Sequence, residues 1–303
     1  MSDGVEARYR LRSLPEYGRV SAWKPTFSGS VLRTVLDDDG VREFWDGDHR
    51  VRPSGDAVRA RQWDRIGDSY LFCHGRASGG EWSPARPEAW IVDAEGAVEA
   101  ELNFGDWVRT VAVDVDRNIW VGYQDQANPW SFPPGADATG RSGVEYWHPA
   151  LVRWDECGTF HWVFAVDGVM AATCYTVNSG PYGVVAVTDA DEPVVRVGVE
   201  GLIAGFGGDL VGPSAVAFDG RVATVLGDFV IPKRRGESGY LDDVLTRIDM
   251  ETGEVVETGR VVMPDGSPLP LGKGVIPYRM AFGRGNIIGM VIGDPGVAHV
   301  LEL

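Results

Sequence analysis

The chain has 303 residues, of which 44% are apolar and 24% are charged, and its formal net charge is −16. That apolar content is enough for a large buried core and excludes a disordered chain. The negative charge argues against direct binding to nucleic acid, because phosphate groups need a basic surface. No apolar run approaches the roughly 20 residues that a membrane helix requires.

The first ten residues are charged and lack the apolar centre of a signal peptide, so we expect a cytoplasmic protein. Three cysteines, Cys73, Cys157 and Cys174, fit that compartment and have no spacing typical of a zinc site. The excess of acids leaves open a basic protein partner or a cation, although such a charge also serves solubility alone. We expect a monomer with no membrane partner.

A repeated pattern of short strands organises the chain. Each unit begins with an apolar strand, a tight Gly/Asp/Asn turn and a second strand that usually ends in Asp; a third strand and, in most units, a fourth follow. The units recur about every 45–65 residues, the spacing of propeller blades. In chain order they span residues 18–52, 59–103, 107–165, 171–206, 214–261 and 279–303.

These units predict an all-β fold in which residues 1–303 form a single β-propeller domain. We count six four-stranded blades, and five or seven also fit the pattern. The last unit ends after three strands, and Val5–Arg12 is the candidate for the missing outer strand. Pairing the two ends of the chain in this way would close the ring and remove exposed sheet edges.

The blade sequence "VAVDVDRNIWVGYQD", followed by "LVRWDECG", resembles that of a broad propeller group. The group holds NHL-repeat proteins, gluconolactonase-like propellers and virginiamycin B lyase, and the chain looks most similar to uncharacterised propeller proteins of actinobacteria. The resemblance implies a propeller, a fold that hosts lyases, hydrolases and binding modules alike. Gluconolactonase-like enzymes hold a divalent cation in the channel, and virginiamycin B lyase uses histidines and a glutamate near a metal. No catalytic residue of either aligns with this chain.

The three longest loops are predicted to lie on one face of the propeller. Residues 75–88, 126–149 and 232–243 all connect a second strand to a third, whereas the turns on the opposite face are short. Long loops inside a compact domain are usually functional or disordered. Aromatic and arginine side chains on such loops often carry binding energy. The predicted ligand-binding residues are Trp82, Trp130, Arg141, Tyr146, Trp147, His148, Arg234 and Arg235.

Two simpler readings apply to this rim. The aromatic side chains would fold back and pack the loops onto the blades. The basic triplet of residues 233–235 would be a solvated loop tip rather than a grip on a carboxylate or phosphate.

Aspartates at the ends of second strands form a second candidate site on the same face. Asp125, Asp189, Asp228 and Asp294 would bind Ca²⁺ or Mg²⁺, which prefer oxygen ligands. The first three, or His148, would alternatively act as a general acid or base. Asp also favours strand ends because its carboxylate accepts local backbone N–H bonds, which requires no function.

The leading hypothesis is therefore a binding propeller that recognises a protein or small ligand on its loop face; one version is an inhibitor of a basic protein. The alternative is a metal-assisted lyase or hydrolase, or a proton-transfer biosynthetic enzyme, at the channel mouth on that face. A scaffold with a plugged channel is a third reading. First strands lie innermost, so Thr110, Thr173, Ser214 and Arg279 are candidates to line the channel, subject to strand register.

Overall fold

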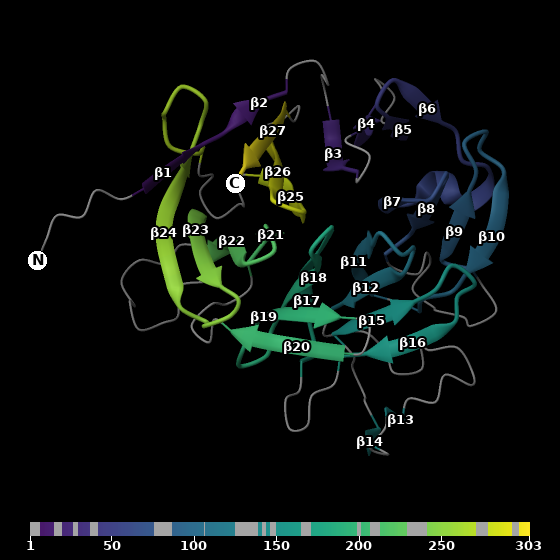
Figure 1. The fold of residues 1–303 in the computed structure, drawn as a ribbon. Helices are drawn as coiled ribbons and strands as arrows, with labels where there is room; N and C mark the ends of the chain where they lie inside the picture. The colour runs from purple at the N-terminus through teal and green to yellow at the C-terminus, as the bar shows by residue number, and fades with distance from the viewer. Residues whose placement is uncertain are drawn as a thin grey trace, which may run out of the picture.

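The computed structural model describes most of the chain: residues 7–14, 20–26, 30–36, 42–75, 87–105, 107–124, 139–140, 144–145, 150–164, 171–198, 201–206, 213–228, 241–270, 278–292 and 297–303. These residues form a ring of six antiparallel sheets, each with its first strand towards the central axis (Figure 1). Helix is confined within them to one 3₁₀ segment at Gly55–Arg59. The described part contains no helix long and apolar enough to cross a membrane.

The six blades follow one another in chain order. Blade 1 contains β3 (Val20–Pro25), β4 (Val31–Leu36), β5 (Arg42–Asp46) and β6 (His49–Val51), and blade 2 contains β7 (Gln62–Ile66), β8 (Ser69–Cys73), β9 (Ala89–Val92) and β10 (Val98–Leu102). Blade 3 contains β11 (Val108–Val113), β12 (Ile119–Tyr123), β15 (Leu151–Trp154) and β16 (Phe160–Val163). A separate pair, β13 (Thr139–Gly140) and β14 (Val144–Glu145), lies within the connection from β12 to β15.

Blades 4 to 6 complete the ring. Blade 4 contains β17 (Cys174–Gly180), β18 (Gly183–Thr188), β19 (Val194–Gly198) and β20 (Gly201–Phe206), and blade 5 contains β21 (Ala215–Phe218), β22 (Val222–Asp228), β23 (Leu241–Asp249) and β24 (Val255–Val262). Blade 6 contains β25 (Tyr278–Arg284), β26 (Ile287–Ile292) and β27 (Val297–Glu302). The predicted six-bladed, all-β propeller is therefore confirmed.

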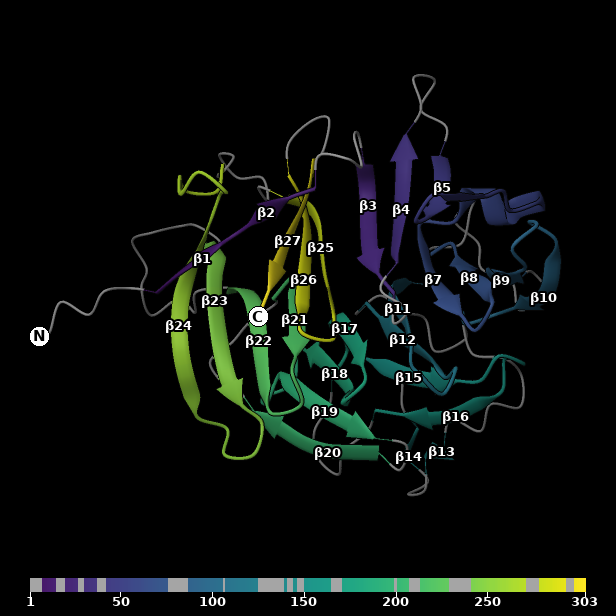
Figure 2. The same ribbon diagram turned by 45° about the horizontal axis from the view of Figure 1, so that its top comes forward.

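The N-terminal segment closes the ring, as predicted, but it divides between two blades. β2 (Arg12–Ser13) pairs antiparallel with β27 and supplies the fourth strand of blade 6. β1 (Ala7–Arg10) instead pairs parallel with β24, as a fifth strand of blade 5 (Figures 1 and 2). Leu11 between them is buried, and its N–H donates to the carbonyl of Val262. The buried leucine thus anchors the chain where it passes from one blade to the next.

Local turn chemistry explains why the hairpins form where the sequence predicts them. Asp114 accepts backbone N–H bonds from Asp116 and Asn118, both at 2.9 Å. Asp155 repeats the arrangement in the same blade, with N–H bonds from Cys157 and Thr159. An Asp side chain that satisfies the backbone two and four residues later stabilises the turn without tertiary contacts. The short connections between first and second strands and between third and fourth strands are therefore fixed locally. They lie opposite the long loops, on the face that we call the turn face.

The channel narrows towards the turn face. A Cβ atom on Gly283 would overlap the carbonyl oxygen of Val216, and one on Gly180 would lie 2.9 Å from the Cα atom of Gly285. The Asn178 side chain fills the remaining space, donating to the carbonyls of Val216 (2.7 Å) and Gly285 (2.9 Å). Backbone from three blades thus meets at the axis, and only glycine permits this approach.

Candidate ligand-binding cup in the central channel

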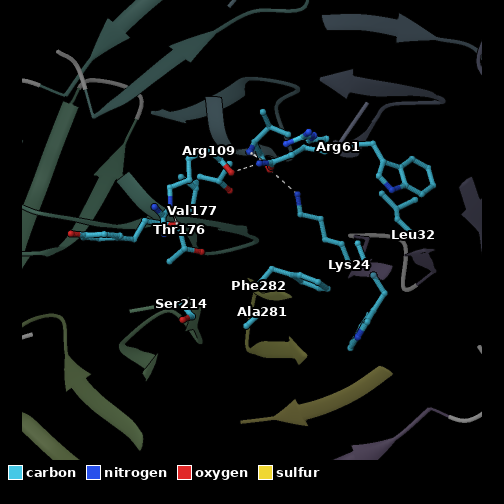
Figure 3. A pocket seen from close by; sticks show the side chains of 16 residues that line it. Lys24, Leu32, Arg61, Arg109, Thr176, Val177, Ser214, Ala281 and Phe282 are labelled. Atoms are coloured by element: carbon cyan, nitrogen blue, oxygen red, sulfur yellow. Dashed lines mark hydrogen bonds between the residues drawn. The ribbon is translucent and has the colours of Figure 1, made fainter. Parts of the chain in front are cut away.

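A cavity of about 310 Å³ lies in the central channel, and all six blades contribute to it. We call it the cup. Its volume is at the lower end of the range for small-molecule sites. Three kinds of side chain surround the open centre (Figure 3). The lining includes the cations Lys24, Arg61 and Arg109, the polar residues Gln62, Thr110, Thr176 and Ser214, and the aromatic residues Trp23, Trp63, Tyr175 and Phe282.

The cup lies in the half of the channel next to the loop face. Thr110 pairs with Gly122 near the end of β12, where the connection to β15 begins. Ser214 immediately precedes β21. The predicted channel positions Thr110 and Ser214 do line the cup. Thr173 is buried and does not line the cup, whose lining in blade 4 begins two residues later, at Tyr175. The side chain of Arg279 lies outside the described residues.

A buried ion-pair network forms the floor of the cup. Asp64 is fully buried and receives the guanidinium of Arg284 through both carboxylate oxygens, one contact being 2.6 Å. The Lys24 ammonium lies 2.9 Å from the same carboxylate and donates at 2.8 Å to the carbonyl of Val111. The backbone N–H of Val113 adds a further bond to Asp64 at 2.9 Å. This one carboxylate joins four blades: its own blade 2 and the blades of Lys24, Val113 and Arg284.

The remaining donors of Arg284 are also satisfied. The guanidinium donates to the Val113 carbonyl at 2.7 Å, to the Pro25 carbonyl at 3.2 Å and to the hydroxyl of Ser179. A buried charge is tolerated only when it is paired and hydrogen-bonded in this manner. Arg284 therefore closes the channel beneath the cup, as a plug between the two faces.

The floor carries more positive than negative charge. Burial on its own would raise the pKa of Asp64, but Arg284 and Lys24 outweigh that effect and hold the pKa below its usual value. The pKa of Lys24 is lowered, first by burial and then by the nearby charge of Arg284, despite the attraction of Asp64. One carboxylate faces two cations, so an anion entering the cup would meet an uncompensated positive charge.

Two further cations, Arg61 and Arg109, line the walls of the cup, and Arg109 is held in place by contacts with Tyr175. The Arg109 side chain donates to the carbonyl of Tyr175 at 3.3 Å, and its guanidinium lies 5.1 Å from the centre of the Tyr175 ring. The Gln62 side chain bridges blades 2 and 3, donating to the carbonyl of Arg109 and accepting from the N–H of Val111 at 3.0 Å. Arg61 is exposed at the cup.

The aromatic part of the lining is apolar in character. The indole N–H of Trp63 donates to the hydroxyl of Thr34, and that of Trp23 donates to the carbonyl of Met290. Both polar atoms are thus satisfied by the blades, and the two rings are largely buried, whereas Phe282 in the lining is half-buried. Cationic and apolar walls together suit a ligand with one anionic and one apolar part.

The predicted rim lies outside the described residues. This applies to Trp82, Trp130, Arg141, Tyr146, Trp147, His148, Arg234 and Arg235, and among the acids to Asp125 and Asp294. Asp228 ends β22, and only its backbone is described. Their roles in binding ligand or metal stay predictions.

Asp189 is the predicted strand-end aspartate whose side chain is described, and His74 follows the corresponding second strand, β8, of blade 2. One carboxylate oxygen of Asp189 accepts the N–H groups of Ala172 (2.8 Å) and Thr173 (2.9 Å), which precede the neighbouring strand β17 and lie 17 and 16 residues away rather than in a local turn. His74 is buried against Trp90, with Nε2 at 3.0 Å from the carbonyl oxygen of Asp56. Among the residues that the structure describes, no three His, Cys, Asp or Glu side chains are grouped to hold a metal ion.

Sequence reasoning missed the charged residues of the cup and its floor. Lys24, Asp64 and Arg284 each lie in the first strand of a blade, and a first strand is innermost. A charge at an innermost position must be paired or functional, because burying it alone is costly. That signal was available, although it does not reveal which partner each charge finds.

No protein-family model matches the chain, and no curated protein matches it in sequence. The WD40 domain of Pan2 from Neurospora crassa is similar in structure, with a TM-score of 0.50 and 8% identity over 100% of this chain and 97% of that domain. Virginiamycin B lyase from Staphylococcus aureus gives a TM-score of 0.47 at 11% identity, covering 97% of this chain and 98% of the lyase. The computationally designed Ika8 protein gives 0.41 at 11% identity, covering 99% and 100%. At these identities the likeness concerns the β-propeller fold alone.

Proposed function

We propose that this protein is a binding propeller whose cup takes a small organic anion with an apolar or aromatic body. The observation that carries the proposal is the excess of positive charge in the cup: Lys24, Arg61 and Arg109 line it, and Asp64, the carboxylate beneath it, is shared with Arg284. This concentration of cations is unusual in a chain whose net charge is −16. The net negative charge of the protein repels anions, so anion binding depends on the local positive charge of the cup.

Each part of the ligand has a counterpart in the lining. A carboxylate or phosphate would accept bonds from Arg61 and Arg109, whose planar guanidinium groups match such oxygens. The ring of an apolar body would pack against Trp63 or Phe282. A protein partner would instead engage the outer rim, and its binding would not depend on the two arginines inside the channel.

The test is a ligand panel on the purified full-length chain. We expect benzoate, phenylacetate and phenylphosphonate to raise the melting temperature, whereas benzamide and phenylacetamide, which are similar in shape but neutral, do not. A ligand at 100 times its dissociation constant adds about 2.7 kcal/mol of stability, which a melting curve resolves. The proposal would be overturned if the neutral amides raised the melting temperature, or if none of the anions raised it.

Charge-removing variants then locate the site. Arg109→Gln and Arg61→Gln should each weaken anion binding about tenfold, since a hydrogen bond to a charged group contributes roughly 1.5–3 kcal/mol. Arg50→Gln is the matched control, because Arg50 lies on the outer strand β6 in an ion pair with Glu43 at 2.6 Å. Equal weakening by all three variants would place the anion outside the cup.

A further inference from the structure

Lys24 has the placement of a reactive amine rather than of a surface lysine. Its side chain lines the cup and is 15% exposed, so part of it is open to a molecule bound there. The sequence contains only three lysines, Lys24, Lys233 and Lys273. Lys24 lies in the innermost strand of a blade, between the buried Trp23 and Pro25.

The surroundings of Lys24 lower its pKa, so its neutral form is easier to reach than that of a lysine in water. Arg284 binds both oxygens of Asp64, so the carboxylate is already neutralised when Lys24 approaches it. Lys24 is then the surplus cation, buried beside a second one. Desolvation and a neighbouring positive charge are the two conditions under which a lysine becomes a nucleophile near neutral pH.

Hydrogen bonding positions the nitrogen for reaction. A neutral amine has two N–H groups and one lone pair. The Asp64 carboxylate at 2.9 Å and the Val111 carbonyl at 2.8 Å accept two N–H bonds, one each. The remaining tetrahedral position then holds the lone pair, as a nucleophile requires.

We propose that Lys24 forms an imine with the carbonyl group of an oxo acid bound in the cup. This inference rests on the proposed function, because Arg61 and Arg109 would hold the carboxylate of that acid. The Lys24 nitrogen attacks the carbonyl carbon, forming the C–N bond as the C–O π electrons move to oxygen. Both amine hydrogens leave with that oxygen as water, and a C=N bond results. No electrons are gained or lost overall.

The probe is phenylpyruvate, an oxo acid with an aromatic body, and sodium cyanoborohydride traps the imine as a stable secondary amine. We expect one adduct with the mass of phenylpyruvate less one oxygen atom, on the peptide that contains Lys24. Lys233 and Lys273 serve as internal controls. At a pH below the pKa values of all three lysines, the lysine with the lowest pKa has the largest neutral fraction, so we expect less label on each of the two controls than on Lys24. Equal labelling of the three lysines would overturn the inference.

3-Phenyllactate separates this inference from the proposed function. It has the same carboxylate and ring but no carbonyl, so it should bind and protect Lys24 without forming an adduct. Stabilisation by 3-phenyllactate with no trapping at Lys24 by phenylpyruvate would overturn the imine and leave anion binding standing. Binding by neither compound would count against the proposed function itself.

A variant distinguishes a reactive amine from a structural ion pair. Lys24→Arg keeps a positive charge against Asp64 but cannot form an imine. We expect it to lose the adduct while the protein stays folded. If Lys24→Arg fails to fold, protection of Lys24 by 3-phenyllactate in the wild-type protein remains a sufficient test, and a lack of protection would contradict the proposal.

Discussion

The two halves of the central channel use charged side chains in opposite ways. Next to the turn face, Arg284 has its donors directed at Asp64 and at backbone and hydroxyl oxygens of the neighbouring blades. Next to the loop face, Arg61 and Arg109 are exposed at the cup. The first half is closed by charge pairing and glycine contacts and serves stability, whereas the second is open and able to bind. Lys24 lies at the boundary, paired below and exposed above.

The largest expected effect follows from breaking the closed half. Asp64→Asn leaves Arg284 and Lys24 buried without a countercharge, and removing one partner of a buried pair typically costs about 3–5 kcal/mol. We expect a loss of that size in the free energy of unfolding measured with urea. Asp116→Asn, at an exposed turn, is the control and should stay within about 0.5 kcal/mol of wild type. A loss below about 1 kcal/mol for Asp64→Asn would contradict a role for this pair in stability.

Acid should act on the same carboxylate with a smaller effect. The pKa of Asp64 is lowered in the folded protein, so the unfolded chain binds the extra proton first as the pH falls. The stability from Asp64 is therefore present above the ordinary pKa of 3.8 and is lost as the pH falls from there through the folded value. We expect urea unfolding at pH 5 to pH 3 to show a flatter pH dependence for Asp64→Asn than for wild type. Parallel slopes would argue against this linkage.

A methyl group in the closed half should also destabilise the protein. Gly283→Ala would place its Cβ atom against the carbonyl of Val216, and backbone must move to admit it. Overpacking of this kind costs about 1–3 kcal/mol. We expect a lower melting temperature together with reduced protection of the Val216 region from hydrogen exchange. An unchanged melting temperature would show that the strands at the axis can accommodate a larger side chain than their glycine contacts indicate.

Filling the open half should affect binding rather than folding. Ser214→Phe adds a ring to a cavity of about 310 Å³ at a half-buried position. We expect anion affinity to fall at least about tenfold, or about 1.4 kcal/mol, measured by isothermal titration calorimetry. The free energy of unfolding should change by less than the Gly283→Ala value. A large loss of stability with unchanged affinity would reverse the roles assigned to the two halves.

The smallest effect is expected on the turn face, away from both halves. Arg117 forms an exposed ion pair with Glu156 at 2.5 Å. Exposed pairs contribute about 0–1 kcal/mol, so Arg117→Gln should change stability within that range and leave anion binding unaltered. Weakened binding in this variant would mean that the net charge of the protein, and not the cup, determines anion affinity.

Much of the fold could be predicted because its signals are local. Asp114 and Asp155 fix their hairpins through bonds to backbone two and four residues later, so the turns could be recognised along the chain. The N-terminal strand was harder to place. Its pairing is divided between β24 and β27, and the division depends on where Leu11 finds a buried position.

The candidate site was predicted only in part. The loop face and the lining positions Thr110 and Ser214 followed from blade topology. The cations Lys24, Arg61 and Arg109 were not predicted, because the predicted ligand-binding residues were aromatic and basic residues on the long loops. The candidates from the innermost strands were Thr110, Thr173, Ser214 and Arg279, and did not include Lys24 or Asp64, which lie in the first strands of blades 1 and 2.

The amino-acid sequence predicted an all-β propeller of about six blades, with five or seven also possible, its closure by the N-terminus and the separation of a turn face from a loop face. These features depend on strand alternation and on turns that are satisfied within a few residues. The meeting of Lys24, Asp64 and Arg284 at the axis is visible in the folded structure and not in the sequence, because 40 residues separate Lys24 from Asp64 and 220 separate Asp64 from Arg284. Closing the ring brings them together, and a slip of one residue in any of the three strands would turn its charge away from the channel.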